Sequence, residues 1–404
     1  MKVLAIPNAH ALAHVSRLLE IAKVLRHAGH DVLFAGHGKY LQVAAADGFA
    51  TRELPYIPEQ RLVEVSRSQR LWEWFGETEL EGFIEAELGL YDEFRPDLVL
   101  LDNRASARTS AEKAGLKTVA VLNVHMSNQR RIPFFSVGNL LHSDNAPGVR
   151  SLDRLENASE VLLWDQLVMR AHNRIRRKLG LKRLYGYQHE QGDLSLYADI
   201  PQFNPVSRLP PGARFVGPLT WHNDLPAPAC LEQLWTDKPT VYLALGSTSL
   251  EDIIGENLHE LSQGMQLVVA TGAAIEPGRQ LPEGVFLEQY VNTDLLLPHC
   301  DLVCCHGGNG TLYQALSFGL PAVVVATHQE QNYGGKRIQQ LGLGRAFTDR
   351  TVKQKGLQPV VEAVREVLEN PRYRANARGF SRNLEGWRPA ERSVWEIERF
   401  MNNH

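Results

Sequence analysis

Two histidines stand four residues apart near the start of the chain, in the stretch PNAHALAHVSRLLEIAKVL. His10 and His14 could form a metal pair, could be a catalytic base and its neighbour, or could be two polar residues of a loop. The metal pair is disfavoured, because the intervening Ala-Leu-Ala lacks the glutamate of a zincin helix and no third ligand follows nearby. A base needs an orienting partner. Asp102, at the end of an apolar run, is the candidate, and a loop carboxylate without that role is the alternative.

The densest group of chemistry-bearing residues is the run from His306 to Thr311, HGGNGT, which joins an apolar strand pattern to a helical one. Glycines let the backbone approach a ligand closely, and a helix N-terminus offers unpaired N–H groups and the positive end of the dipole. The run therefore predicts an anion site suited to phosphate, or else a tight strand–helix turn without a ligand. It is neither a P-loop nor a GxGxxG fingerprint.

Strand and helix patterns alternate on both sides of these residues. A helix is expected at Val15–Ala28, and strands are expected at Lys2–Pro7, Asp31–Ala35, Leu98–Leu101, Thr118–Leu122, Val241–Leu245, Gln266–Ala270, Asp301–Cys305 and Ala322–Ala326. Continuous apolar strands between helices are typical of parallel sheets that are covered on both faces. The predicted fold class is α/β, with two facing, Rossmann-like, doubly wound domains and a ligand in the interdomain cleft. Residues 125–195 are polar and poorly periodic, and they are expected to elaborate the first domain.

Composition narrows the function classes. The chain has 404 residues, 44% of them hydrophobic and 22% charged, which fits two globular domains. A net charge of −3 argues against a nucleic-acid-binding protein. No apolar run is long enough to span a bilayer and no signal peptide is evident, so a cytoplasmic location without an integral membrane segment is expected. The four cysteines lack zinc-site spacing and are expected to be reduced.

The sequence resembles family 1 nucleotide-sugar glycosyltransferases, which are UDP-glycosyltransferase-like enzymes of the GT-B fold, and the bacterial natural-product and macrolide type in particular. The resemblance rests on His-Gly-Gly-x-Gly-Thr, on Gly-x-Pro eight residues after Thr311, and on an acid–Gln pair 24 positions after His306, which is Glu330-Gln331. It extends over nearly the whole chain. It includes Phe215-Val216-Gly217-Pro218 and the Gly246-Ser247-Thr248 turn.

The resemblance implies a donor site in the second half of the chain. His306, Gly308 and Thr311 would hold the diphosphate, together with Gly307, Asn309, Gly310, Ser247 and Thr248. Gln314 stands where the family usually has a glutamate on the ribose, and Tyr290 stands near a tryptophan that stacks on the base. Glu330 and Gln331 would receive hydroxyl groups of the sugar. Because Gln314 cannot offer a charge-assisted bond, UDP and dTDP donors both stay open. Gly334 replaces a usual asparagine, and the sequence does not explain it.

The resemblance also assigns roles at the opening histidines. The family motif Gly-His-x-x-Pro places its histidine at His14, with Ala13 and Arg17 in place of the glycine and the proline. His14 would be the general base of an inverting transfer and Asp102 its orienting partner. A helix N-terminus disfavours the imidazolium form. No metal or other cofactor is expected, and the chain has no Asp-x-Asp.

The acceptor is expected to be a small apolar or aromatic molecule bound by the first domain. The candidate acceptor-binding residues are His10, Trp72, Trp74, His125, Phe134 and Phe135. Arg130 and Arg131 could meet an anionic group, although a solvated basic pair is the simpler interpretation. The expected organisation is an acceptor domain at 1–218, a proline-rich linker at 219–238, a donor domain at 239–385, and a helix at 386–404 that packs back on the first domain.

Other functions stay open. A glycolipid-forming transferase would use a basic, apolar patch on the first domain, and the basic stretch Arg174–Lys178 is compatible with it. A nucleotide-sugar 2-epimerase would need further acid–base residues, and a non-catalytic donor-binding auxiliary protein would not need His14 and Asp102. A homodimer is also open.

Overall fold

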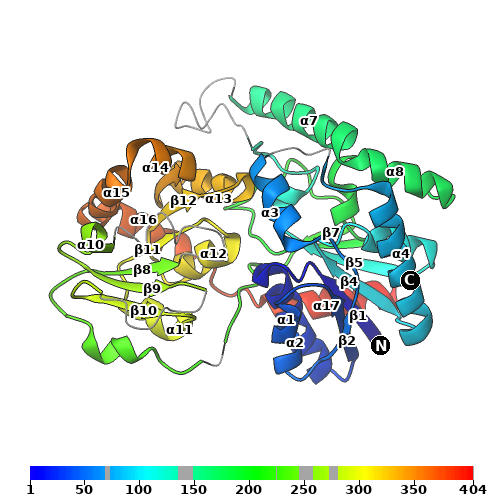
Figure 1. The fold of residues 1–404 in the computed structure, drawn as a ribbon, viewed down its shortest axis with the longest axis horizontal. Helices are drawn as coiled ribbons and strands as arrows, with labels where there is room; N and C mark the ends of the chain where they lie inside the picture. Colours follow the sequence, from blue (N-terminus) through cyan, green and yellow to red (C-terminus); the bar gives the residue numbers. More distant parts are fainter. Residues whose placement is uncertain (69–72, 135–148, 224, 245–257, 273–280, 404) are drawn as a thin grey trace. The chain divides into compact units, whose positions relative to one another are not determined.

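The structure is a computed structural model that describes the chain except residues 69–72, 135–148, 224, 245–257, 273–280 and 404 (Figure 1). The described chain forms two compact units. One runs from Met1 to Trp221 and takes in the residues from Gly386 onward, and the other spans His222–Glu385. Each unit contains one parallel sheet with alternating helices, which confirms the predicted α/β class with two Rossmann-like domains.

The sheet of the first unit has seven parallel strands in the order β3-β2-β1-β4-β5-β6-β7. The strands are β1 Lys2–Pro7, β2 Asp31–Gly36, β3 Ala50–Glu53, β4 Leu98–Asp102, β5 Lys117–Leu122, β6 Leu194–Tyr197 and β7 Ala213–Phe215. β4 is buried along its whole length and β1 along all but its first residue, as expected for central strands that are covered on both faces.

The helices of the first unit are α1 Leu12–His27, α2 Leu41–Ala46, α3 Glu59–Ser68, α4 Glu77–Phe94, α5 Ala107–Lys113, α7 Val149–Leu167, α8 Met169–Lys178 and α17 Pro389–Asn402. α1 begins three residues before the predicted Val15, because Leu12 and Ala13 are good helix formers and Ala11 adopts the extended conformation of a cap. His14 is therefore the third residue of the helix. Among the described residues, no helix has the length and apolar character needed to cross a bilayer.

The poorly periodic segment at 125–195 contains two helices that the sequence pattern did not indicate, α7 and α8, which together form a long helical stretch. Four leucines of α7 are exposed, so apolar residues occur on more than the buried face of this helix. The sequence therefore lacks the clear helical spacing of apolar residues. These leucines are Leu152, Leu155, Leu162 and Leu163.

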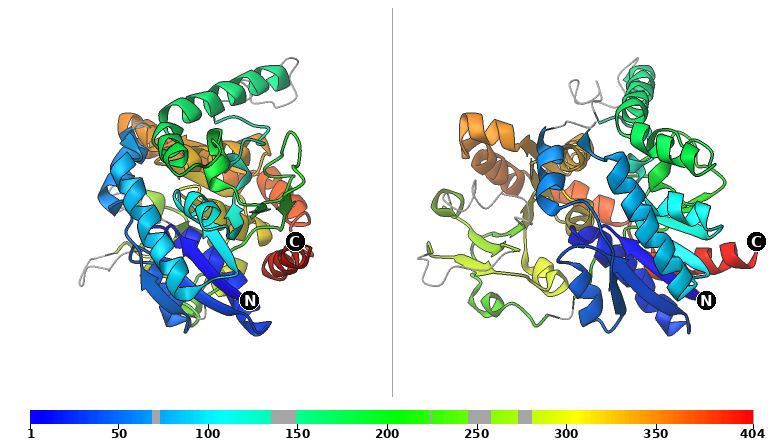
Figure 2. Two further views of the ribbon diagram at one scale, coloured as in Figure 1. Left: turned by 90° about the vertical axis from the view of Figure 1, so that its right-hand side faces the viewer. Right: turned by 45° about the vertical axis from the view of Figure 1, so that its right-hand side comes forward.

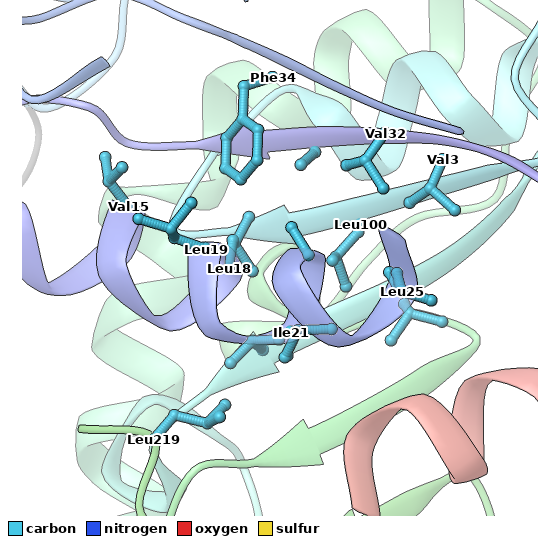
Figure 3. Packing of buried hydrophobic residues seen from close by; sticks show 14 of the residues in the cluster. Val3, Val15, Leu18, Leu19, Ile21, Leu25, Val32, Phe34, Leu100 and Leu219 are labelled. Atoms are coloured by element: carbon cyan, nitrogen blue, oxygen red, sulfur yellow. The ribbon is translucent and has the colours of Figure 1, made fainter. Parts of the chain in front are cut away.

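The core beside β1 and β2 is built on α1 (Figure 3). Leu18 and Leu19 of α1 point toward the sheet that carries Phe34, and Leu25 and Leu100 are fully buried in the same core. The i, i+3, i+4 spacing of the apolar residues of α1 is what lets one helix face cover the sheet.

The last helix closes the first unit. α17 packs against α1, with Val394 and Ile397 buried in the same core. The start and the end of the chain lie close together in all three views (Figures 1 and 2). His30 links them, since its Nδ1 lies 3.1 Å from the amino group of Met1 and its Nε2 lies 3.0 Å from Glu398 Oε1.

The sheet of the second unit has six parallel strands in the order β10-β9-β8-β11-β12-β13. Its strands are β8 Thr240–Ala244, β9 Gln266–Ala270, β10 Val285–Glu288, β11 Leu302–Cys305, β12 Ala322–Ala326 and β13 Gly344–Thr348. Its helices are α10 Leu258–Leu261, α11 Thr293–Leu296, α12 Asn309–Ser317, α13 Gln329–Gln340, α14 Asp349–Lys355, α15 Gln358–Glu369 and α16 Pro371–Ser381. The four cysteines of the chain all belong to this unit, and they are free and buried, as the sequence predicted.

In each sheet the strand order reverses once, between β1 and β4 in the first unit and between β8 and β11 in the second. Ligands of open α/β sheets bind beyond the carboxyl ends of the strands at such a reversal. The loops that follow β1, β4 and β11 are therefore the first places to look for a site.

Candidate active site

His14 and Asp102 meet at the reversal point of the first sheet. β1 and β4 pair in parallel with Pro7 opposite Asp102, so the start of α1 lies beside the end of β4. His14 Nδ1 lies 2.6 Å from Asp102 Oδ1. The Asp102 side chain is 1% exposed and the His14 side chain 19% exposed, so the carboxylate is enclosed while the imidazole reaches the surface of the unit. With Nδ1 bound to the carboxylate, Nε2 is the nitrogen that can take up a proton.

The side chain of Arg17 also binds Asp102, which the sequence did not predict. Arg17, one turn after His14, donates from Nε to Asp102 Oδ2 at 2.8 Å and from Nη2 to Asp102 Oδ1 at 2.7 Å. Its Nη1 donates to Asn123 Oδ1 at 2.5 Å, at the end of β5. The one feature of the sequence that pointed to Arg17 was its charge, because it lies within the apolar face of α1.

His10 has different surroundings. It precedes α1, and its Nε2 lies 2.7 Å from the carbonyl oxygen of Ile57, to which the ring donates. Burial is the main cause that lowers the pKa of His10. Its ring lies 5.4 Å from that of His37 and 6.2 Å from that of Tyr56. Among the described residues, no group of three His, Cys, Asp or Glu side chains could hold a metal ion.

The glycine-rich run lies at the reversal point of the second sheet, directly after β11. α12 begins at Asn309, and its cap residue Gly308 provides no side-chain hydrogen bond. Gly307 has a φ of +94°, and a Cβ there would lie 2.7 Å from the carbonyl oxygen of Gln331. Only glycine fits this position. The amide nitrogen Asn309 Nδ2 is buried without a hydrogen-bond partner, and it is a donor in the loop where the sequence predicted an anion.

His306 is held in its neutral form. Burial lowers its pKa to about 4, and nearby His328 acts in the same direction, while a hydrogen bond to the backbone of Ala244 and the charge of Glu330 oppose the shift. His306 Nδ1 is buried without a hydrogen-bond partner. The ring is therefore tied to the end of β8 and has one nitrogen left for a ligand.

The other described candidate donor residues belong to the same unit as this loop. Gln314 Nε2 donates to Thr293 Oγ1 at 3.0 Å, and Tyr290 is 40% exposed with its hydroxyl donating to the carbonyl of Gly272. Gln331 Oε1 accepts from the backbone N–H and the hydroxyl of Thr327, each at 2.9 Å, which fixes this side chain at the start of α13. Glu330 is the neighbouring, partly exposed residue of the same helix turn. Ser247 and Thr248 lie outside the described residues.

Gly334, which the sequence left unexplained, has a structural reason. A Cβ at this position of α13 would lie 2.7 Å from the carbonyl oxygen of Gly307 and 2.9 Å from Leu312 Cδ1. The helix therefore packs directly on the glycine-rich loop, and a side chain would separate the two.

The candidate acceptor residues fall into separate groups. The rings of His125 and Phe134 lie 6.1 Å apart, and both residues are buried. Trp74 packs instead on Trp164 of α7, at 6.2 Å between ring centroids. His10 lies in neither ring pair, and Trp72 and Phe135 lie outside the described residues.

Most of the basic side chains noted at Arg130-Arg131 and in the stretch Arg174–Lys178 form ion pairs within the first unit. Interpreting Arg130 as part of a solvated pair is wrong, because its side chain is buried against Glu160 at 2.7 Å and stacks on Phe134. In the basic stretch of α8, Arg174 pairs with Glu77 and Lys178 with Glu81, while buried Arg176 pairs with Glu112.

Comparison with known proteins supports the resemblance. Residues 257–392 match the family model "Erythromycin biosynthesis protein CIII-like, C-terminal domain". A "PGL/p-HBAD biosynthesis rhamnosyltransferase" of Mycobacterium bovis (strain BCG / Pasteur 1173P2) is 29% identical, over 93% of this chain and 82% of the relative. An "Inactive PGL/p-HBAD biosynthesis glycosyltransferase" of the same strain is 30% identical, over 65% of this chain and 71% of the relative.

Among solved structures, the spinosyn rhamnosyltransferase SpnG superposes with a TM-score of 0.71 at 19% identity, covering 98% of this chain and 100% of that one. This superposition shows that the two proteins share a fold. The chain thus belongs to the family 1 nucleotide-sugar glycosyltransferases of the GT-B fold, and it is a glycosyltransferase.

Proposed function

We propose that the protein is an inverting glycosyltransferase that moves a sugar from a UDP- or dTDP-sugar to a hydroxyl group of a small apolar or aromatic acceptor. The observation that carries this proposal is the 2.6 Å contact between His14 Nδ1 and the enclosed carboxylate of Asp102. A histidine held in this way has the geometry of a general base with its orienting partner.

In the proposed reaction, the acceptor hydroxyl gives its proton to His14 Nε2 as its oxygen attacks the anomeric carbon of the donor sugar. The bond between that carbon and the diphosphate oxygen breaks, and the nucleoside diphosphate leaves with the electron pair. Attack from the side opposite the leaving group inverts the configuration at the anomeric carbon. Asp102 stabilises the imidazolium that forms.

The donor would bind along the glycine-rich loop of the second unit. The uncapped N–H groups at the start of α12 and the buried amide of Asn309 are donors suited to the diphosphate, which gains negative charge as it leaves. Thr311 adds a hydroxyl in the first turn. Tyr290, Gln314, Glu330 and Gln331 keep the roles proposed for the nucleoside and the sugar. We propose that the reaction needs no metal.

The test is an assay for released nucleoside diphosphate, run over UDP- and dTDP-sugars and an acceptor library, with product mass and anomeric configuration by NMR. We expect acceptor-dependent release, an inverted product, and turnover that millimolar EDTA leaves nearly unchanged. A retained configuration, or a tenfold loss with EDTA that magnesium restores, would contradict the proposal. Donor binding without any transfer would favour an auxiliary role.

A lipid-linked acceptor is the second candidate. The observation that favours it is that α7 exposes Leu152, Leu155, Leu162 and Leu163, with Arg170 and Arg177 exposed on the following helix. Sedimentation with vesicles of anionic phospholipid distinguishes the two candidates. A Leu155→Ser/Leu162→Ser variant should lose vesicle binding only if this face meets lipid.

A further inference from the structure

The guanidinium group of Arg17 is enclosed among the groups proposed to do the chemistry. The residue is 8% exposed, and its nitrogens donate three hydrogen bonds, two to Asp102 and one to Asn123, while Nη2 also lies 3.0 Å from His14 Nδ1. The resemblance gives it no role, because the family motif has proline at this position.

The two bonds to Asp102 form a fork in which each carboxylate oxygen accepts one N–H. Such bidentate pairs fix the orientation of the carboxylate as well as binding it. The fork is anchored from the other side, since Nη1 donates to Asn123 Oδ1 and Asn123 Nδ2 donates to the carbonyl of Ala198 at 3.1 Å. Arg17 therefore connects the carboxylate of Asp102 to Asn123, which follows β5, and through Asn123 to Ala198, which follows β6.

The same geometry selects one tautomer of His14. Asp102 Oδ1 lies 2.6 Å from His14 Nδ1, and Arg17 Nη2 also donates to that oxygen. If Nδ1 carried no proton, its lone pair would face the carboxylate oxygen at 2.6 Å, which is repulsive. With a proton on Nδ1, both donors converge on Oδ1 and Nε2 keeps its lone pair.

Charge is the second consequence. Arginine stays protonated in proteins, so Arg17 compensates the enclosed negative charge of Asp102. Because the same positive charge also lies near the imidazolium that forms during the reaction, the benefit of Arg17 is in holding the carboxylate and its orientation rather than in attracting the imidazolium.

We propose that Arg17 is the positioning residue of the His14–Asp102 pair, and that the working unit is a His–Asp–Arg triad in which Arg17 fixes the carboxylate and, through it, the tautomer of the base. This inference rests on the proposed function, in which His14 is the base. Arg17 touches no reacting atom and acts through Asp102.

The experiment compares Arg17→Met and Arg17→Lys with Arg26→Met, an exposed arginine of the same helix. We expect kcat of Arg17→Met to fall by about 10–100-fold, as when other orienting partners are removed. The Kd for UDP should stay within about twofold, since the proposed donor site lies in the other unit. Arg17→Lys should recover only part of kcat, because lysine keeps the charge but not the fork. Arg26→Met should behave as the wild type.

A double-mutant cycle tests whether Arg17 acts through Asp102. In an Asp102→Asn background, Arg17→Met should lower kcat by less than about threefold more, because residues that act as one unit are not additive. Independent effects that multiply would overturn the inference. If Arg17→Met alone does not fold, Arg17→Lys decides, since a wild-type kcat in that variant would rule out the fork.

A spectroscopic readout is independent of turnover. The Nδ1 proton of His14 in its short bond to Asp102 should give a far-downfield proton NMR signal that His14→Ala removes. The signal should be lost or moved in Arg17→Met and unchanged in Arg26→Met. If His14→Ala and Asp102→Asn are crippled while the Arg17 variants keep kcat and the signal, this inference is wrong and the proposed function stands. If His14→Ala keeps full activity, the proposed function itself is wrong.

Discussion

At the scale of single residues, the two histidines on either side of the start of α1 have different surroundings. The ring of His14 is bound to an enclosed carboxylate, whereas His10 donates to the backbone of Ile57 and packs on other rings. An interaction changes kcat strongly only if it is stronger in the transition state than in the ground state, and the structure gives His10 no such interaction with the His14–Asp102 pair.

His14→Ala should therefore lower kcat by roughly 10²–10⁴-fold with little change in donor Kd. His10→Ala should cost less than about tenfold. Steady-state kinetics with one good acceptor, together with calorimetric donor binding, check both values. A crippled His10→Ala beside an active His14→Ala would mean that the motif has been aligned to the wrong histidine.

The sequence predicted His14 and Asp102 but not the role of Arg17. Motif spacing identifies residues that the family shares, and a basic residue in an apolar helix face gives no indication of which carboxylate it meets. Its partner lies 85 positions away, and only the register of β1 against β4 brings the two together. Gly334 is a similar case, because its crowding comes from a backbone oxygen of another loop.

At the scale of elements, the contact between α13 and the glycine-rich loop can be tested at Gly334. Alanine there would place a Cβ 2.7 Å from the Gly307 carbonyl oxygen, and this is a backbone atom that cannot swing away. We expect a net loss of about 1–3 kcal/mol in stability, as for other overpacked sites, together with weaker UDP binding. Thermal unfolding and calorimetry measure the two effects.

Gly379→Ala is the matched control, because Gly379 lies within α16 of the same unit with no atom within 4 Å of its added Cβ. It should be neutral or stabilising by up to about 1 kcal/mol. Equal behaviour of the two variants would contradict the account of Gly334.

The packing of α17 on α1 gives a second test at this scale. Ile397 is fully buried in the core beside α1, so Ile397→Ala should destabilise the first unit by about 2–5 kcal/mol. Trp395, on the same helix, is 54% exposed, and Trp395→Ala should change stability by about 0.5 kcal/mol or less. Hydrogen exchange resolved by peptide should show the loss of protection in the first unit. Loss confined to the second unit would refute the prediction.

The sequence indicated the central strands because fully buried strands are continuous apolar runs. The strands β3, β6, β7, β10 and β13 were missed. Four of them are edge strands that are mostly exposed or half-buried and carry little pattern, and β6 is an inner strand of only four residues. α7 was missed because its exposed leucines blur the helical period. Patterns thus predict elements best where burial is complete.

At the scale of the whole molecule, buried neutral histidines in both units should make stability depend on pH. Burial lowers the pKa of His172 well below its ordinary 6.5, with His189 and Arg176 acting in the same direction, and burial lowers that of His306 to about 4. In the unfolded chain both rings take up protons below about pH 6.5. Their contribution is therefore fully present above that pH and is lost as the pH falls.

Calorimetric unfolding between pH 7.5 and pH 5 should show a falling melting temperature, with each histidine contributing at most about 1.4 kcal/mol per pH unit. His172→Asn should flatten the pH dependence of the first unit and His306→Asn that of the second. A pH dependence that both variants leave unchanged would exclude these histidines as its source.

The buried cysteines have a practical consequence. Burial raises the pKa of Cys230 to about 11 and those of Cys300 and Cys305 to about 12, and it also raises that of Cys304. Thiols react as thiolates, so near neutral pH these four should be almost inert to maleimide dyes. One cysteine introduced at exposed Tyr185 and another at exposed Arg382 would then carry a fluorophore pair without removal of any native cysteine. Single-molecule energy transfer between the dyes could follow the two units through a catalytic cycle in an otherwise unmodified enzyme.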